Sequence, residues 1–499
     1  GLKKLAGELC GEPLPSFSSV TDGKHFDELD SMDEETIRYS CADSDFALRL
    51  YRIFNNWFDR FLPKHRFLVE EVESPTAVYL GIMKYNGVPM NLPLMQERKA
   101  EADAAMERIR SEIAFMIGDV NIGSNCSTNA FKSYLFNDLG LPVLKTTESN
   151  REAADDATMI MLKEWCDTNR PELSHLFELV QEYRKWNKIA STYINGYMKY
   201  INPVTGRIHP NFYALSTDTG RFSCSSPNLQ NAPRKTNDPI GVRNFIKAPE
   251  GCLIVSCDYS QIELRVGAHY CQDDIMLETY RTGGDIHAAT TGVIFNIPYD
   301  QAQDKHAENY KERRTIAKNV NFGTFYGLFP RGLQKTLKFK AGVEKSVEQC
   351  QEIIANLKAG YPALVTWQEE TKADAYRKMY SETRLGRRRY LPSIRSEDWG
   401  KKSFAERCSM NTPIQGTAAD ILKLALGRIL FGLPERPWLK PILQIHDELT
   451  FIIPEDKLTE AVTFIKGCME SQPFPEFDLP LVAEASAGPT FGQMEELED

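Results

Sequence analysis

Two short apolar segments, far apart in the chain, constrain the fold more than any other sequence feature. Gly251–Cys257 is an apolar run that leads into Asp258, a pattern typical of a buried strand. Ile442–Ile453 has two apolar arms around the polar triplet His446-Asp447-Glu448, which predicts a strand, a tight turn and a second strand. Residues 260–430 between them have mainly helical patterns. Helices inserted between distant strands favour an α+β fold.

The remaining segments are mostly helical in pattern as well. Residues 1–65 are acidic and rich in helical periodicity. Apolar side chains share one helical face in residues 94–117, and Gly118 is expected to end that helix. Helical patterns also run from residue 130 and through residues 152–193, whereas residues 207–214 resemble a strand.

Composition excludes several classes of protein. The chain has 499 residues, of which 42% are hydrophobic and 26% are charged, as in globular proteins rather than disordered or collagenous ones. The longest uninterrupted apolar run is short, so we expect no transmembrane helix. The eleven cysteines include no CxxC pair, which favours free thiols in a reducing cytoplasm.

Charge is unevenly distributed along the chain. The net charge of −10 does not by itself suggest a nucleic-acid partner. Residues 376–402, however, contain nine Lys and Arg against three Asp and Glu, whereas residues 1–50 contain five basic and eleven acidic residues. The sequence therefore predicts an acidic region and a local basic stripe.

Asp258 and Asp447 are the acids whose positions suggest chemistry. For either acid alone, the preference of Asp for turns and strand ends is the favoured explanation. Together, on neighbouring strands, they could hold two Mg²⁺ ions for phosphoryl transfer, because Mg²⁺ needs only one or two carboxylates besides phosphates and water. The spacing of the two acids in the sequence does not establish that they are neighbours.

A stripe of cations and aromatic residues is predicted on one helix. Arg314, Lys318, Phe322 and Tyr326 recur at intervals of four residues, so a helix would place them on one face. Such a face fits a nucleotide, with the cations on the triphosphate and a ring against sugar or base. An ordinary amphipathic helix with a solvated basic end is the alternative, and the stripe alone does not decide between them.

These segments and several others resemble the motifs of family A DNA polymerases of the bacterial DNA polymerase I type. The matching segments, in order, are 219–223 with 227–231, 255–265, 285–287, 314–327, 386–392, 406–420 and 444–448. The resemblance extends from about residue 66 to the C-terminus. One such match would be weak, but their number and order make the resemblance specific.

The resemblance assigns a role to each site residue. It implies that Asp258, Asp447 and the backbone carbonyl of Tyr259 hold two Mg²⁺ ions, for which Mn²⁺ can substitute. It implies that the incoming dNTP contacts Arg314, Lys318, Phe322, Tyr326, His287, Glu263 and Gln261, and that Lys318 also donates a proton to the departing pyrophosphate. It implies that primer–template DNA contacts Arg221, Arg407, Asn411, Gln415 and His446, and that Glu448 is an outer-shell carboxylate.

Two residues sharpen the expected substrate. Glu263 occupies the position that excludes a ribose 2′-OH in this family, so DNA synthesis is favoured over the RNA synthesis of phage-type RNA polymerases. Phe322 occupies the position where Phe, rather than Tyr, accompanies discrimination against dideoxynucleotides. The basic segment 384–402 and residues 121–145 are expected to follow DNA phosphates, although a solvated basic loop is the simpler interpretation of Arg387-Arg388-Arg389 alone.

The resemblance also implies a right-hand polymerase architecture with palm, fingers and thumb. The expected parts are a partial RNase-H-like 3′–5′ exonuclease domain at 1–65, a thumb with its palm root at 66–200, palm at 201–265, fingers with a returning helix at 266–419 and palm at 420–499. Tyr39 and Asp43 resemble the last exonuclease motif. The earlier metal motifs of that domain do not precede them, so we expect no proofreading from this chain.

The expected setting is DNA replication or repair in the cytoplasm of a bacterium or of a phage-infected cell, with an organellar origin left open. A monomer is expected to act there on primer–template DNA without a membrane or an obligate protein partner. Reverse transcription or lesion bypass by the same site remains an alternative. So does a DNA-binding relative with an inactive site, although the two acids and the two cations are all present.

Overall fold

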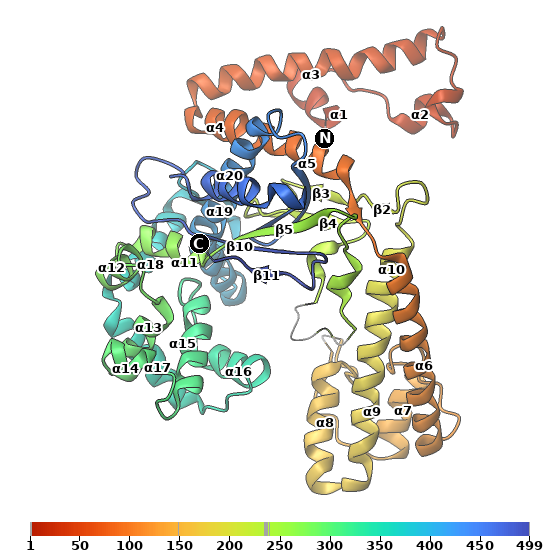
Figure 1. The fold of residues 1–499 in the computed structure, drawn as a ribbon, viewed down its shortest axis with the longest axis vertical. Coiled ribbons are helices and arrows are strands. Elements are labelled where there is room, and N and C mark those ends of the chain that lie inside the picture. The colour runs from red at the N-terminus through yellow and green to blue at the C-terminus, as the bar shows by residue number, and fades with distance from the viewer. Residues whose placement is uncertain (1, 148, 234–237, 239, 499) are drawn as a thin grey trace.

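The centre of the molecule is a five-stranded antiparallel sheet of order β11-β10-β5-β9-β8 (Figure 1). The computed structural model describes residues 2–147, 149–233, 238 and 240–498. The strands of the sheet are β5 (Cys252–Tyr259), β8 (Lys440–Ile445), β9 (Glu448–Pro454), β10 (Ala483–Gly488) and β11 (Glu495–Glu496). Both apolar segments of the sequence therefore become strands of this sheet, as predicted, and Asp258 is the penultimate residue of its strand.

Helices from distant parts of the chain pack around this sheet. α5 (Ser74–Asn86) packs on β8, and α20 (Leu458–Glu470) packs on β5 and β10. α19 (Trp399–Gly432) lies against both α5 and α20, and Asp398 caps it by accepting a hydrogen bond from the Lys401 N–H. The short helices η3 (Leu68–Glu73) and η10 (Glu455–Lys457) precede α5 and α20. Burial of Val255, Leu449 and Phe451 joins the sheet to these helices in one core.

A helical unit fills the chain between β5 and α19. It contains α11 (Ile262–Cys271), α12 (Asp274–Arg281), α13 (Ile286–Phe295), α14 (Tyr299–Gln303), α15 (Tyr310–Thr324), α16 (Pro330–Ala341), α17 (Val347–Gly360) and α18 (Pro362–Lys378). A hairpin of β6 (Tyr380–Glu382) and β7 (Arg388–Tyr390), followed by η9 (Pro392–Arg395), leads into α19. The α15 helix ends at Thr324, so Tyr326 lies beyond the helix on which the spacing pattern placed it.

A second helical unit extends from the opposite side of the sheet and has its own core (Figure 1). It contains α6 (Leu92–Ile117), α7 (Asn129–Ser133), η4 (Tyr134–Asp138), α8 (Asp156–Asn169), α9 (Pro171–Lys188), η5 (Ile189–Asn195) and α10 (Gly196–Met198). The predicted helix over 94–117 is confirmed and starts at Leu92 because Asn91 caps it. The helical pattern over 152–193 is interrupted at Arg170, since Pro171 begins a new helix.

Short strands and turns connect these units. They are β1 (Val88–Pro89), β2 (Arg207–Ile208), β3 (Asn211–Tyr213), β4 (Ser223–Ser225), η6 (Leu229–Asn231) and η8 (Val242–Phe245). The strand-like stretch 207–214 is thus divided in two at Pro210, which cannot donate to a ladder.

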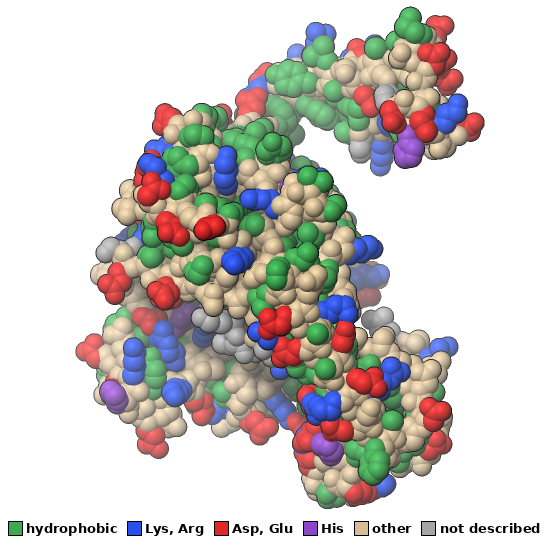
Figure 2. All heavy atoms as spheres, turned by 45° about the vertical axis from the view of Figure 1, so that its right-hand side comes forward, with side chains coloured by type: hydrophobic (Ala, Val, Ile, Leu, Met, Phe, Trp, Pro, Cys, Tyr) green, Lys and Arg blue, Asp and Glu red, His purple; other side chains and the backbone are tan. Residues whose placement is uncertain are grey.

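The N-terminal elements form an arm that projects from the rest of the molecule (Figures 1 and 2). They are α1 (Leu2–Leu5), η1 (Ala6–Cys10), α2 (Phe17–Thr21), η2 (Phe26–Glu28), α3 (Glu34–Arg60) and α4 (Pro63–Phe67). Large apolar side chains of this arm, including Leu48, Tyr51 and Phe61, are exposed. Across the described part of the chain, none of the helices has the length and apolar character needed to cross a membrane.

Candidate active site

The pairing of β5 with β9 brings the two singled-out acids together. Asp258 lies directly opposite Glu448, and the Tyr259 N–H donates a hydrogen bond of 3.3 Å to the backbone oxygen of Asp447. Asp447 lies in the two-residue turn between β8 and β9, where His446 adopts a left-handed φ of 54°. The tight turn therefore holds Asp447 beside the end of the neighbouring strand.

A row of carboxylates crosses the sheet at this point. Glu484 of β10 is opposite Asp258 on the other side of β5, so three acids stand side by side in the register Glu484–Asp258–Glu448. Like charges in directly opposite positions destabilise a sheet. Sequence analysis missed Glu484, because only the register of a distant strand identifies it.

The pKa values reflect this crowding. The pKa of Asp258 is raised to about 7. The main cause is partial removal of its carboxylate from water, followed by the negative charges of Glu448, Asp447 and Glu484. Burial raises the pKa of Asp447 to about 6, although the adjacent Arg221 opposes the shift. Burial also raises the pKa of Glu448, against the hydrogen bond that it accepts from the Ser256 hydroxyl. A divalent cation would stabilise the ionised form of such a group.

These acids fit a hard divalent cation. Among the residues that the structure describes, no three His, Cys, Asp or Glu side chains are arranged to hold a metal ion by themselves. Two carboxylates suffice for Mg²⁺, which usually keeps several waters and binds substrate phosphates. Arg221 is the only cation within ion-pair distance of Asp447 in the described part of the chain, and none is that close to Asp258.

The acids line a cleft of about 690 Å³ that also contains a polar network around Glu263. The Glu263 carboxylate accepts hydrogen bonds from the Arg221 guanidinium and the Tyr326 hydroxyl, and a longer one of 3.5 Å from Gln415. The same Arg221 nitrogen lies 3.4 Å from Asp447 Oδ1. Arg221 thus links the residue expected to select the sugar with one of the acids.

The α15 helix contributes cations and an aromatic ring. Arg314 pairs with Asp285, while Lys318, one turn later, is exposed and forms no ion pair with any acid in the described residues. Phe322 lines the cleft with about half of its surface exposed. Tyr326 follows the helix, and Gly327 takes a φ of 78° next to it. The chain therefore leaves the helix just where Tyr326 turns toward Glu263.

His287 occupies a buried polar position behind this helix. Its Nδ1 accepts a hydrogen bond of 2.9 Å from Asn321, whose side-chain oxygen accepts one from Thr290. Burial, with Arg314 and Lys318 nearby, lowers the pKa of His287 to about 4 despite the opposing charge of Asp285. His287 is therefore neutral at pH 7, and its Nε2–H is the ring donor left for a ligand.

The residues expected to contact DNA are distributed around the same cleft. Arg407, Asn411 and Gln415 recur every four residues along α19, so they share one face of this helix. His446 and Gln415 line the cleft, while Arg407 bonds to Ser403. Gln261 directly precedes α11 and accepts a hydrogen bond of 3.2 Å from Tyr280.

Further residues of the cleft were missed by sequence analysis. Arg243 lines it, and its guanidinium lies 4.6 Å from the centroid of the Phe491 ring. No local pattern marked Arg243. Asp285 belongs to the matching segment 285–287, but its pairing with Arg314 follows only from the packing of α13 on α15.

Two further expectations fall outside the cleft. Tyr39 and Asp43 lie one turn apart on α3, in the projecting arm (Figure 1). Arg387 is buried and pairs with Asp420, Arg388 pairs with Glu382, and Arg389 pairs with Asp218. The interpretation of these three arginines as a solvated basic loop is therefore wrong. Arg387 is also too deeply buried to contact a DNA phosphate.

Comparison with known proteins identifies similar chains. The model of DNA polymerase family A matches residues 93–493. The chain is 35% identical over 451 residues to a thermostable DNA polymerase I of Thermus filiformis, covering 89% of this chain and 50% of the relative. It is 34% identical over 459 residues to DNA polymerase I of Pseudomonas aeruginosa, covering 91% of this chain and 47% of that relative. The chain thus spans about half the length of these curated relatives.

The fold is also similar to a solved structure. The POL domain of Pol1 from M. smegmatis, in complex with DNA primer-template and dNTP, superposes with a TM-score of 0.81 and 26% sequence identity. The match covers 99% of this chain and 79% of the other. The cleft described above is therefore set in the α+β, right-hand fold of that domain.

Proposed function

Because this chain belongs to DNA polymerase family A, we propose that it extends a primer 3′-OH with dNTPs by template-directed DNA synthesis, releasing pyrophosphate. The observation that carries the proposal is the pairing of β5 and β9, which sets Asp258 and Asp447 side by side in the cleft lined by Phe322. Lys318 lies one turn before Phe322 on the same helix, exposed and without an acidic partner among the described residues.

Asp258, Asp447 and the Tyr259 carbonyl would hold two Mg²⁺ ions, or Mn²⁺ in their place. Bound ions would make the primer hydroxyl a better nucleophile and offset charge on the leaving group. The protein groups then position and neutralise the reactants. Arg314, Lys318 and the Nε2–H of neutral His287 bind the triphosphate, and Lys318 can protonate the departing pyrophosphate.

The parts of the molecule have proposed roles in this reaction. The central sheet is the palm, the α11–α18 unit is the fingers, and the α6–α10 unit is the thumb. The helix face carrying Arg407, Asn411 and Gln415 contacts the minor groove of the primer–template. Acceptors there are nearly the same for every base pair, so such contacts test pair geometry rather than sequence.

Primer extension on a labelled DNA hairpin tests the proposal. We expect extension with dNTPs and Mg²⁺, none in the presence of a chelator, and little with rNTPs. Extension with rNTPs would favour an RNA-synthesising relative. Binding of the duplex without extension would favour an inactive DNA-binding relative, whereas extension on RNA or damaged templates would indicate relaxed template use.

Replacing Glu263 with alanine is expected to relax sugar selection. The carboxylate narrows the cleft where a 2′-OH would lie, and removing it should raise rNTP over dNTP incorporation by about 10- to 200-fold. The ratio of kcat/KM values for one matched rNTP and dNTP pair measures the effect. Glu263→Gln keeps the volume and should retain most of the selectivity, and equal selectivity in all three proteins would contradict the assignment.

Phe322→Tyr is expected to increase use of dideoxynucleotides. A tyrosine hydroxyl can replace the hydrogen bond lost with the nucleotide 3′-OH, a contact to a charged group that contributes about 1.5–3 kcal/mol, or roughly 10- to 100-fold. The ratio of ddNTP to dNTP incorporation measures it. Phe322→Leu removes the ring without adding a donor and serves as the control, and an unchanged ratio in Phe322→Tyr would exclude this role for the position.

A further inference from the structure

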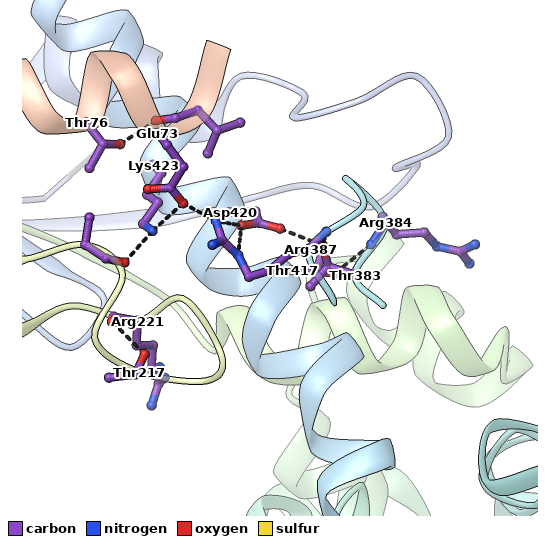
Figure 3. Close-up of polar contacts among 12 residues, drawn as sticks. Glu73, Thr76, Thr217, Arg221, Thr383, Arg384, Arg387, Thr417, Asp420 and Lys423 are labelled. Atoms are coloured by element: carbon purple, nitrogen blue, oxygen red, sulfur yellow. Dashed lines mark hydrogen bonds and ion pairs between the residues drawn. The ribbon is translucent and has the colours of Figure 1, made fainter. Parts of the chain in front are cut away.

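Four charged side chains form a buried cluster outside the catalytic cleft (Figure 3). Glu73 ends η3, Arg387 precedes β7, and Asp420 and Lys423 lie one turn apart on α19. Their side chains are at most 12% exposed. We call these residues the charge cluster.

The charge cluster is internally neutral and densely bonded. Arg387 donates to Asp420 Oδ1 from Nε at 2.8 Å and from a terminal nitrogen at 2.7 Å, and that nitrogen also reaches Glu73. Lys423 donates to Glu73 at 2.7 Å, and the Thr383 hydroxyl donates to Asp420 at 2.7 Å. Replacing buried ion pairs of this kind by apolar residues is often neutral or stabilising, so stability alone does not explain their presence.

Lys423 also contacts both ends of the loop that carries Arg221. Its ammonium donates a hydrogen bond of 2.9 Å to the Ala214 carbonyl and lies 5.4 Å from the centroid of the Phe222 ring. Such a distance permits a cation–π contact. One buried cation therefore contacts the first and the last residue of this loop, residues 214–222.

Arg387 contacts the same loop at Gly220. This glycine has a φ of 79°, and a Cβ atom built on it would lie 2.5 Å from Arg387 Nε. The loop is braced internally, because the Thr217 hydroxyl donates to the Arg221 carbonyl at 2.7 Å. This bond constrains the shape of the loop, whereas Lys423 and Arg387 contact the loop from outside.

We propose that Lys423 and Arg387 are positioning residues that set the location of Arg221 and, through it, of Glu263 and Asp447. The inference rests on the proposed polymerase function and deepens it. Neither residue lines the cleft, and their contacts with the loop of residues 214–222 are the route by which each would act on Arg221. A loop displaced by about 1 Å would separate the Arg221 guanidinium from both carboxylates, and misplacement of that size can cost about 10²-fold in rate.

A double-mutant cycle between Lys423→Met and Arg221→Ala tests the proposal. In single-turnover incorporation of one dNTP, Lys423→Met is expected to lower the maximal rate by about 10- to 100-fold with little change in the affinity for duplex DNA. In the Arg221→Ala background the same substitution should lower the maximal rate by no more than about twofold, because its effect passes through Arg221. Lys372→Met, which removes a lysine that pairs with Glu369 near the surface of α18, is the matched control.

A purely structural role gives a different result. Equal losses from Lys423→Met in both backgrounds, or no loss in the single variant, would overturn the proposal. If Lys423→Met fails to fold, the cycle is run with Gly220→Ala, which leaves all four charges in place and crowds Arg387. The same non-additive result is expected there, and additive losses would again contradict the inference.

Failure of the proposed function would be recognised separately. If the unmodified protein does not extend a primer, a crystal structure of Lys423→Met still decides the inference. A displaced segment Ala214–Phe222 with a broken Arg221–Glu263 contact supports it. An unchanged segment refutes it, whatever the activity of the chain.

Discussion

Asp258→Ala and Asp447→Ala are each expected to reduce nucleotide incorporation by about 10³-fold or more, while binding of duplex DNA persists. Each variant removes one of the two carboxylates proposed to hold the metal ions, and the charge stabilisation lost in the transition state amounts to several kcal/mol. Duplex binding depends instead on phosphate contacts spread over a larger surface. Single-turnover incorporation and fluorescence anisotropy with a labelled hairpin measure the two properties separately.

A matched control is the exposed acid Asp456, which follows β9 and is remote from the cleft lining. Asp456→Ala should incorporate nucleotides at the unmodified rate. If either site variant retained normal extension, the metal assignment would be wrong. If both variants lost duplex binding together with extension, the loss would reflect a collapsed cleft rather than missing ligands.

Asp420→Ala is expected to destabilise the folded protein by about 3–5 kcal/mol, because it leaves Arg387 buried without its main partner. Asp420 is completely buried, accepts two hydrogen bonds from Arg387 and accepts one from Thr383. Removing one member of a buried ion pair lowers the free energy of unfolding by more than the intact pair contributes to it, because the remaining charge stays buried without a partner.

Urea unfolding, followed by tryptophan fluorescence and by circular dichroism, measures this loss. Asp374→Ala removes an acid that pairs with Arg377 and Lys378 at the surface. It should lower the free energy of unfolding by less than about 1 kcal/mol. A similar midpoint for the Asp420 and Asp374 variants would show that the charge cluster contributes no more than surface pairs do. The two probes should agree if the central sheet and the helices packed on it unfold as one unit.

The parts of this molecule that sequence could predict are those set by local patterns. The apolar run at 251–257 and the two apolar arms within 442–453 became strands because each is bounded by turn residues. The helix at 92–117 followed from its periodicity and from Gly118. The identity of the fold rested on the order of several motifs and is confirmed by the family match.

The parts that sequence could not predict depend on distant partners. The acid row of Glu484 and Glu448 around Asp258 exists only through strand register. Arg387 looks like a surface residue in its basic segment, but Asp420 and Glu73, from other parts of the chain, draw it into the core. Tyr326 fits a helical spacing, yet the helix ends two residues before it.

The strand β5 carries Asp258 in the middle of the sheet, and both of its neighbours come from the last part of the chain. During synthesis on the ribosome its two edges stay unpaired while the α11–α19 segments are made. Unpaired apolar edges promote association with other chains, and contacts between distant segments form slowly. Asp258 and Asp447 therefore cannot come together until the helices α11–α19 between them have been synthesised.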